Sequence, residues 1–362
     1  MTQKIHRDAL KNAKRIVVKA GTKVLVQSTG RPDKRRLGLL VDELAQFQNQ
    51  GGEVAFVSSG AVGAGLEALG MKKRPTAIPD LQMAAAVGQT RLMSLYDNLF
   101  GENKCKSGQV LLTHDVLKHR ERHLNARNTL LNLIANRIVP IINENDAIST
   151  EEIQFGDNDV LAALVAILID ADALVLLSTT DGLRNEDNKR VSYIEEVDDE
   201  VLGLVSDKQD KLSTGGMASK LESAQIAAHN GIPVVIANGR KSSVLTRILQ
   251  GKDEGTLLFP KEGNISKRKR WIAFFNRAEG LLVVDDGAAA ALEKGKSLLP
   301  VGVKNVEGSF KLGAMVNIQT EGGKHIARGL VEYSSADIAD IKGRKTSATT
   351  GEVIHRDNMV VL

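Results

Sequence analysis

The chain of 362 residues has almost no cysteine, few aromatic residues and no long hydrophobic run. Cys105 is the only cysteine, so neither an intrachain disulfide nor a zinc site built on several thiolates can form. Aromatic residues make up 3%, which leaves few side chains to stack on single-stranded nucleic acid. The most apolar stretch, residues 160–169, is too short to span a bilayer, and residues 1–14 lack the apolar core of a signal peptide. These absences exclude a disulfide-stapled secreted fold and predict a cytoplasmic protein.

The composition that remains is typical of a folded protein of enzyme size. Hydrophobic residues make up 42% and charged residues 25%, and the length is sufficient for two or possibly three domains. Lysine and arginine number 48 against 44 aspartate and glutamate, a net charge of +4. Because this excess is small for so long a chain, net charge argues neither for nor against a nucleic-acid partner.

Short apolar runs alternate with helical patterns over about the first 260 residues. We expect strands at residues 15–19, 53–57, 109–112, 138–142, 174–177 and 233–237. Between them we expect helices through residues 37–47 and at about 121–136, 158–170 and 217–230. This alternation predicts an α/β fold, in which an open, mostly parallel sheet lies between two layers of helices.

The pattern changes after about residue 251. Residues 251–270 are rich in glycine and charge and include four consecutive basic residues, 267–270. Beyond them, short strands are expected at 281–284, 315–319, 326–331 and 359–362, with one helix at 288–294. We therefore predict a first domain over 1–262, a basic linker over 263–275, and a small β-barrel-like domain over 276–362.

Polar groups of a few recurring kinds follow the strands of the first domain. The groups that follow strands are Lys19-Ala20-Gly21-Thr22, Ser58-Ser59-Gly60, Asn143-Glu144-Asn145-Asp146 and Ser178-Thr179. A further group, Thr214-Gly215-Gly216-Met217-Ala218-Ser219-Lys220, opens the helix before the sixth strand. The carboxyl ends of parallel strands meet at one edge of the sheet, so we expect these groups to converge there. Glycine turns at helix N-termini and lysine side chains bind phosphate oxygens, and Asp159 is placed to hold two lysines near one phosphate.

Other nucleotide and metal motifs are incomplete. Gly295-Lys296-Ser297 matches the end of a Walker P-loop, but the first glycine of that motif would fall at Ala290. The segment 63–68 fits a relaxed dinucleotide fingerprint, yet it follows the second strand and lacks a ribose-binding acid at the expected distance. His114, His119 and His123 are close in sequence, but they form no His-Glu-x-x-His motif, and the charged neighbours 120–122 favour a solvated helix start. None of these motifs outweighs the phosphate site.

Seven motifs in order carry a resemblance to a known family. They are Val17-Val18-Lys19-Ala20-Gly21-Thr22, Ser58-Ser59-Gly60-Ala61, Ala86-Val87-Gly88-Gln89, Leu124-Asn125-Ala126-Arg127, Asn143-Glu144-Asn145-Asp146, Gly156-Asp157-Asn158-Asp159 and Gly215-Gly216-Met217-Ala218-Ser219-Lys220. In these motifs the chain resembles the amino acid kinase family, and within it the kinases that act on glutamate. Segments 284–288, 297–302 and 326–329 are similar to a PUA domain, the small β-barrel-like domain predicted above.

The resemblance implies ATP-dependent phosphorylation of the side-chain carboxylate of L-glutamate to L-glutamyl 5-phosphate, the first step of proline biosynthesis, with Mg²⁺ bound to the ATP phosphates. It implies catalytic roles for Lys19, Lys220 and Asp159. The substrate-binding residues implied are Ser59, Gly60, Asn143, Asp146 and Asn158. The nucleotide-binding residues implied are Lys19, Ser178, Thr179, Thr214, Gly215, Gly216, Met217, Ala218, Ser219 and Lys220.

The resemblance also implies partners and leaves some questions open. We expect proline as a feedback inhibitor and the glutamyl phosphate reductase (glutamate-5-semialdehyde dehydrogenase) as the next enzyme. We also expect a homodimer or a homotetramer. RNA binding through the PUA domain is a further possibility, which no other feature supports. Arg184 stands where the family usually has an aromatic residue, which puts the nucleotide contact of Thr179 in question. Two alternative functions are kept: another amino acid kinase, acting on aspartate or acetylglutamate, and an RNA-binding or RNA-modifying protein.

Overall fold

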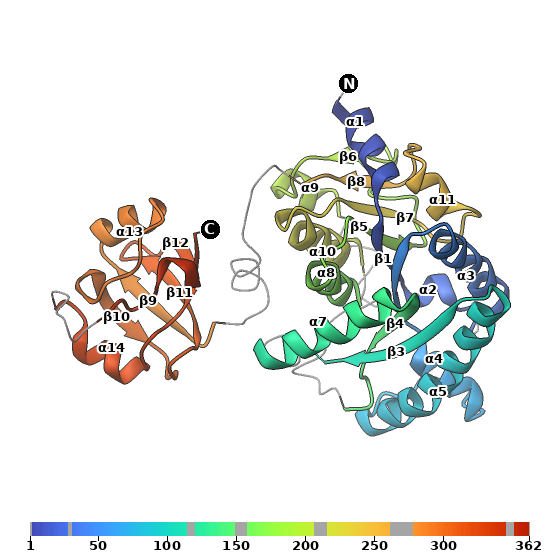
Figure 1. Cartoon of the computed structure of the whole chain (residues 1–362), viewed down its shortest axis with the longest axis horizontal. Coiled ribbons are helices and arrows are strands. Elements are labelled where there is room, and N and C mark those ends of the chain that lie inside the picture. Colours follow the sequence, from blue (N-terminus) through green and yellow to red (C-terminus); the bar gives the residue numbers. More distant parts are fainter. Residues whose placement is uncertain are drawn as a thin grey trace. The chain divides into compact units, whose positions relative to one another are not determined.

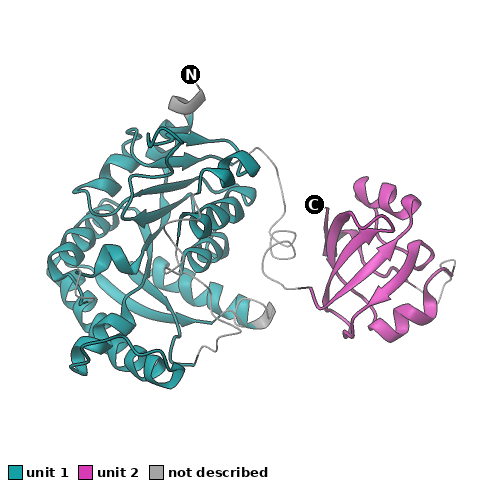
Figure 2. Cartoon of the chain, turned by 180° about the vertical axis from the view of Figure 1, so that it is seen from behind, with its two compact units in different colours: residues 1–263 teal, residues 264–362 magenta. Residues whose placement is uncertain are grey.

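The structure, a computed structural model, describes residues 2–27, 31–113, 120–148, 158–205, 216–260, 278–344 and 351–361. The chain divides into two compact units, residues 1–263 and 264–362, drawn in two colours in Figure 2. The linker predicted over 263–275 lies outside the described residues. No helix in the described ranges is both long and apolar enough to cross a membrane.

An eight-stranded sheet forms the centre of the first unit (Figure 1). Its strand order is β3–β4–β2–β1–β5–β7–β8–β6, and all neighbours are parallel except β7 and β8. The bounds are β1 Arg15–Ala20, β2 Glu53–Ser58, β3 Lys106–Leu112, β4 Ile138–Glu144, β5 Ala173–Ser178, β6 Tyr193–Ile194, β7 Val234–Asn238 and β8 Thr256–Leu258. The predicted open, mostly parallel sheet is confirmed. The sequence missed β6 and β8 because two or three residues are too few to show an alternation.

Helices cover both faces of this sheet, as Figure 1 shows. Side chains of α3 Lys34–Asn49, α5 Ile78–Glu102 and α11 Val244–Leu249 share one buried cluster with the strands. Packed against the strands outside that cluster are α7 Arg120–Ala135, α8 Asn158–Leu168 and α10 Met217–His229. The shorter helices of this unit are α1 Thr2–Ala9, η1 Leu10–Asn12, α2 Thr22–Leu25, α4 Ala61–Ala68 and α9 Asp199–Gly203.

Alternation along β1 decides where its lysine lies. Ile16, Val18 and Ala20 belong to the buried cluster that contains α3 and α5. Successive side chains of a strand point to opposite faces, so Val17 and Lys19 face the α8 side. Because α8 packs against β1 there, the lysine ammonium is buried among groups of that helix.

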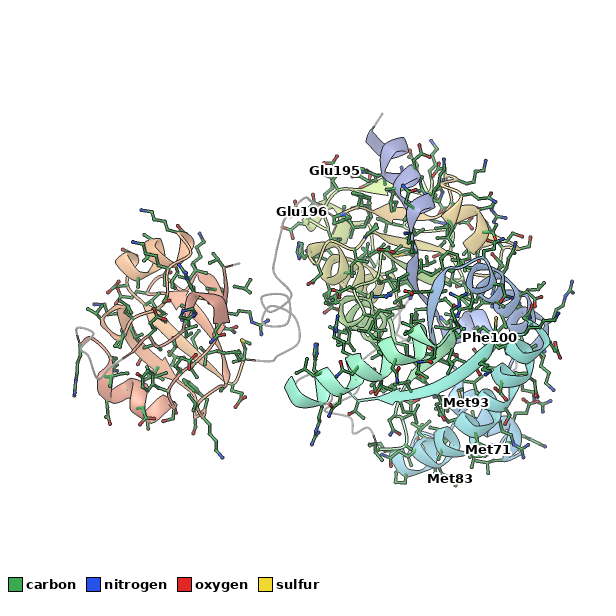
Figure 3. All side chains as sticks on the ribbon, in the orientation of Figure 1. Met71, Met83, Met93, Phe100, Glu195 and Glu196 are labelled. Carbon is green, nitrogen blue, oxygen red and sulfur yellow. The ribbon has the colours of Figure 1, made fainter. Side chains whose placement is uncertain are left out.

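Close backbone contact between α4 and α5 requires two glycines. A β-carbon added at Gly65 would lie 1.8 Å from the carbonyl oxygen of Ala84, and one at Gly88 would lie 1.8 Å from that of Ala61. Both distances are well inside van der Waals contact, so only glycine fits at these two positions. The crossing brings the middle of α5 against the start of α4, which is the element that follows β2. Further along α5, Met93 and the fully buried Phe100 lie on the helix as labelled in Figure 3.

The second unit contains a five-stranded sheet of order β10–β9–β11–β12–β13. Neighbours are antiparallel except β9 and β11, which are parallel. The elements are β9 Gly280–Val284, α13 Asp286–Glu293, η2 Pro300–Gly302, β10 Val303–Glu307, β11 Met315–Thr320, β12 His325–Leu330, α14 Ser335–Ile341, η3 Arg356–Asn358 and β13 Met359–Val361. The four predicted strands are present, and β10 was missed. The helix begins two residues earlier than predicted because Asp285 caps it, accepting a hydrogen bond from the Ala288 N–H at 2.8 Å.

Candidate active site

A buried carboxylate between two lysines lies at the edge of the sheet where β1 ends. Lys19 Nζ is 2.6 Å from Asp159 Oδ1, and Lys220 Nζ donates a hydrogen bond of 2.8 Å to Asp159 Oδ2. The exposed fractions are 1% for Lys19, 0% for Asp159 and 4% for Lys220. Two positive charges face one negative charge here, so the trio carries a net charge of +1. Buried charge of this sign suits a phosphoryl group, whose oxygens supply further negative charge.

Three separate elements supply the members of this trio. Lys19 lies near the end of β1, Asp159 in the first turn of α8, and Lys220 in the first turn of α10. A carboxylate in the first turn of a helix is stabilised by the positive end of the helix dipole, which supports Asp159 as the ionised partner. The structure thus brings together the three residues for which the resemblance implies catalytic roles.

A chain of amide hydrogen bonds joins the predicted substrate residues. Asn158 Nδ2 lies 2.8 Å from Ser59 Oγ, 2.9 Å from Asn143 Oδ1 and 3.2 Å from the carbonyl oxygen of Ser58. Gly60 adopts φ = 109°, a conformation that favours glycine, and α4 begins directly after it. The turn therefore holds Ser59 against Asn158. Among its described neighbours, Asn158 Oδ1 is buried without a hydrogen-bond partner, so an acceptor remains free.

Asp146 lines a pocket of about 200 Å³ beside this series of hydrogen-bonded amides. The pocket lies between β3, β4, α4 and α5, and Ala61, Gln89 and Glu144 also line it. Burial raises the pKa of the Asp146 carboxyl to about 6, although the nearby Arg74 guanidinium acts in the opposite direction. The carboxylate is therefore ionised at neutral pH but poorly solvated, and a cationic ligand would stabilise it.

The predicted nucleotide residues lie at the ends of β5 and α10. Ser178 is the last residue of β5, and its carbonyl accepts a hydrogen bond of 2.9 Å from the Gly239 N–H. Thr179 follows it and is half-buried. Gly216 precedes α10, whose first turn contains Met217, Ala218 and Ser219. Thr214 and Gly215 lie outside the described residues, so their nucleotide roles, like those of the other positions, remain predictions.

Arg184 is occupied within its own turn. Its guanidinium donates to the carbonyl oxygen of Asn188 at 3.2 Å and to the side-chain oxygen of Asn188 at 2.9 Å. Asn188 itself has φ = 60°. The arginine that replaces the family's usual aromatic residue therefore closes a hairpin turn.

A second cleft, of about 900 Å³, is unsuited to phosphate. Acidic residues dominate its polar lining, and Figure 3 labels two of them, Glu195 and Glu196, beside α9. The others are Glu186, Asp187, Asp198, Asp199 and Glu200. Because carboxylates repel a triphosphate, the lysine trio suits one better than this cleft does.

Sequence reasoning missed two residues of α5 that contact the predicted site. Tyr96 is fully buried, and its hydroxyl lies 2.7 Å from Ser58 Oγ; burial raises the pKa of this phenol. Gln89 accepts a hydrogen bond of 3.0 Å from Asn143 Nδ2 through its Oε1. A signal for Gln89 existed, since it ends one of the seven motifs. Tyr96 had none, because a lone tyrosine in an amphipathic helix is indistinguishable from an ordinary core residue.

The described residues do not test the metal site considered for the three histidines. His114 and His119 lie outside the described residues, and His123 is buried on α7. In the described ranges no group of three or more His, Cys, Asp or Glu side chains could hold a metal ion.

Comparison with known proteins agrees with this geometry. The model of the amino acid kinase family matches residues 14–238, and that of the PUA domain matches residues 280–353. A glutamate 5-kinase of Chromohalobacter salexigens is 46% identical, with 100% of this chain and 99% of that protein aligned. Those of Moorella thermoacetica and Caldanaerobacter subterraneus subsp. tengcongensis are 44% and 43% identical, with 100% and 96% of this chain and 100% and 98% of those proteins aligned.

The chain therefore belongs to the amino acid kinase family and is a kinase, with a PUA domain as its second unit. Its place within that family is among the glutamate 5-kinases, which it matches over its full length. The alternative of an RNA-modifying enzyme is not favoured, and neither is a kinase for aspartate or acetylglutamate.

Proposed function

We propose that this chain transfers the γ-phosphoryl group of ATP to the side-chain carboxylate of L-glutamate, the first step of proline biosynthesis. An oxygen of that carboxylate attacks the γ-phosphorus while the bond from this phosphorus to the β–γ bridging oxygen breaks. The products are L-glutamyl 5-phosphate and ADP. A carboxylate is already a competent nucleophile, so the protein needs to align the reactants and offset charge rather than remove a proton.

The buried trio of Lys19, Asp159 and Lys220 is the observation that carries this proposal. Each lysine contacts a different oxygen of Asp159, so this one carboxylate holds the two ammonium groups close together. Lysines fixed in this way offset the charge that develops on the transferring phosphoryl group, and they need little reorganisation during the reaction. Asp159 acts as a positioning residue because its oxygens contact the lysines.

Mg²⁺ would be bound chiefly through the nucleotide phosphates. Both oxygens of Asp159 contact lysine, and the described residues provide no cluster of three metal-binding side chains. Mg²⁺ commonly keeps several waters and is bound by substrate phosphates rather than by an all-protein cage. When bound, the ion would supply further positive charge to the β- and γ-phosphate oxygens.

The hydrogen-bonded amides of Asn158 and Asn143 and the 200 Å³ pocket support the assignment of the amino acid binding site. Asp146 is a half-buried carboxylate suited to the α-ammonium group, and the free Oδ1 of Asn158 is a second acceptor for its hydrogens. Ser59, Gly60 and Asn143 complete the site in this proposal. The nucleotide lies on the side of Ser178, Thr179 and the segment 214–220.

A coupled assay of ADP release tests the function directly. The wild-type chain with ATP and Mg²⁺ is offered glutamate, aspartate and acetylglutamate in turn. We expect the highest kcat/KM with glutamate. A clear preference for either of the other two would replace glutamate as the substrate, and no ADP release with any of them would overturn the proposal.

Several partners follow from this function and are proposed with it. Proline, the end product of the sequence of reactions, is proposed as a feedback inhibitor. Glutamyl phosphate is a reactive acyl phosphate, which favours prompt consumption by glutamate-5-semialdehyde dehydrogenase. We also propose a homo-oligomer and a cytoplasmic location. Mass in solution, with and without glutamate, tests the assembly.

A further inference from the structure

Gln89 lies where α5 passes the amino acid pocket, and the function proposed above gives it no role. The crossing of α4 and α5 at Gly65 and Gly88 places it beside Ala61, and both residues line the pocket with Asp146. Its side chain is half-buried and accepts the hydrogen bond from Asn143 at 3.0 Å. Within the described residues, this hydrogen bond anchors the oxygen end of the side-chain amide and leaves its nitrogen end without a partner.

The orientation of the Gln89 amide follows from the backbone carbonyl of Ser58, to which it is linked through Asn143 and Asn158. The carbonyl oxygen of Ser58 can only accept, so the Asn158 atom 3.2 Å from it must be the amide nitrogen. The same nitrogen donates to Asn143, which therefore presents its oxygen to Asn158 and its nitrogen to Gln89. Gln89 must then present Oε1 to Asn143. The Ser58 carbonyl therefore determines which end of each side-chain amide is oxygen and which is nitrogen, in Asn158, Asn143 and Gln89.

The consequence is a free pair of donors at the pocket. Nε2 of Gln89 carries two hydrogens, and in the part of the chain that the structure describes no group accepts from them. Asp146 and Glu144 give the pocket two carboxylates, and Gln89 is one of the neutral donors that line it, together with Thr90, Gln109 and Asn145. Donors without a partner favour an anionic ligand group.

We infer that Gln89 donates through Nε2 to the α-carboxylate of the amino acid substrate. This inference rests on the proposed function. The α-carboxylate and the α-ammonium are bonded to the same carbon, so the residue that binds the first must share a pocket with Asp146, which is proposed to bind the second. Gln89 would then select substrates that carry a carboxylate beside the amine, and Asn143 and Asn158 would fix the direction of its donors.

Gln89→Glu tests the direction of the donors. Its carboxylate can still accept the hydrogen bond from Asn143. It has no hydrogens to donate to the substrate α-carboxylate, however, and its negative charge repels that group. We expect the KM for glutamate to rise about 10- to 100-fold, with the KM for ATP unchanged and kcat within about threefold of wild type. Gln82→Glu is the matched control, because it places the same charge on α5 outside the pocket lining. An equal rise in both variants, or no rise in Gln89→Glu, overturns the inference.

Gln89→Met is the second variant, and it removes the donors without adding charge. For this variant we compare the KM for glutamate with the inhibition constant of 4-aminobutyrate, which is glutamate without its α-carboxylate. The glutamate KM is expected to rise about tenfold while the 4-aminobutyrate constant stays within about twofold. Parallel losses for both compounds would mean a merely structural role and overturn the inference. Failure of the proposed function is distinguished by the wild-type chain, which would then release no ADP with glutamate.

Discussion

Lys220 is the residue whose loss we expect to affect the chemical step most directly. Lys220 is 4% exposed and its ammonium is bound to Asp159, and a phosphoryl group in transfer would attract this ammonium more strongly than bound ATP does. Lys220→Ala should therefore lower kcat by about 100-fold, close to 3 kcal/mol, while the KM for glutamate changes little. Steady-state kinetics measures both constants. The control is Lys189→Ala, an exposed lysine of the same unit; near-normal turnover of Lys220→Ala would contradict the assignment.

Asp146 should give glutamate affinity a pH dependence. Burial raises its pKa to about 6, so below that pH the carboxyl is protonated and loses its attraction for the substrate ammonium. The wild-type kcat/KM for glutamate should fall by about tenfold for each pH unit below 6 and level off above it.

Asp146→Asn checks the origin of that profile. This variant should have a KM for glutamate about 10- to 100-fold higher at pH 8, because it lacks the charge in both the ground state and the transition state. It should also lack the inflection near pH 6. An unchanged inflection would assign the titration to another group, and a rise in the KM for ATP instead would move Asp146 to the nucleotide side.

At the scale of elements, the crossing of α4 and α5 positions the amino acid pocket. Gly88→Ala adds a β-carbon 1.8 Å from the carbonyl oxygen of Ala61, so the two helices must separate. We expect the free energy of unfolding to fall by about 3 kcal/mol, measured by denaturant titration. The matched control is Gly101→Ala in the same helix, where the added β-carbon meets no atom within 4 Å. That change should stabilise the chain by about 0.5–1 kcal/mol, and equal effects of the two variants would contradict the crossing as described.

At the scale of the whole molecule, catalysis should be separable from the PUA domain. Every residue proposed for chemistry lies between Lys19 and Lys220, within the first compact unit. A chain ending at Gly263 should therefore fold and release ADP with glutamate at a kcat within about threefold of the full chain, because none of the catalytic contacts is removed. Circular dichroism, the coupled assay and mass in solution check this. A folded but inactive fragment would mean that residues after 263 complete the active site.

The sequence alone was sufficient for the order of the larger strands of the first unit and for the trio, but it did not predict α5, the 25-residue helix that lines the amino acid pocket. Strands β1, β2, β4, β5 and β7 are apolar runs of five to seven residues between helical patterns, so their length and spacing identified them. Parallel strands end at one edge, and for this reason Lys19 and Asp159 could be expected together although 140 positions separate them. The seven ordered motifs did the same for the family.

The tertiary structure decided what depends on a particular contact between distant segments. Strands β6 and β8 were missed because segments of two and three residues are defined by the strand beside them more than by their own pattern. Strand β10 was missed because three of its five residues, Lys304, Asn305 and Glu307, are polar. The sequence could not predict that Gln89 presents its amide hydrogens to the pocket, because the orientation of an amide depends on its hydrogen-bond network. Here that network runs through Asn143 to the Ser58 carbonyl. Residue types and periodicity are local, whereas the direction of a hydrogen bond and the fit of a glycine at 1.8 Å exist only once the chain has folded.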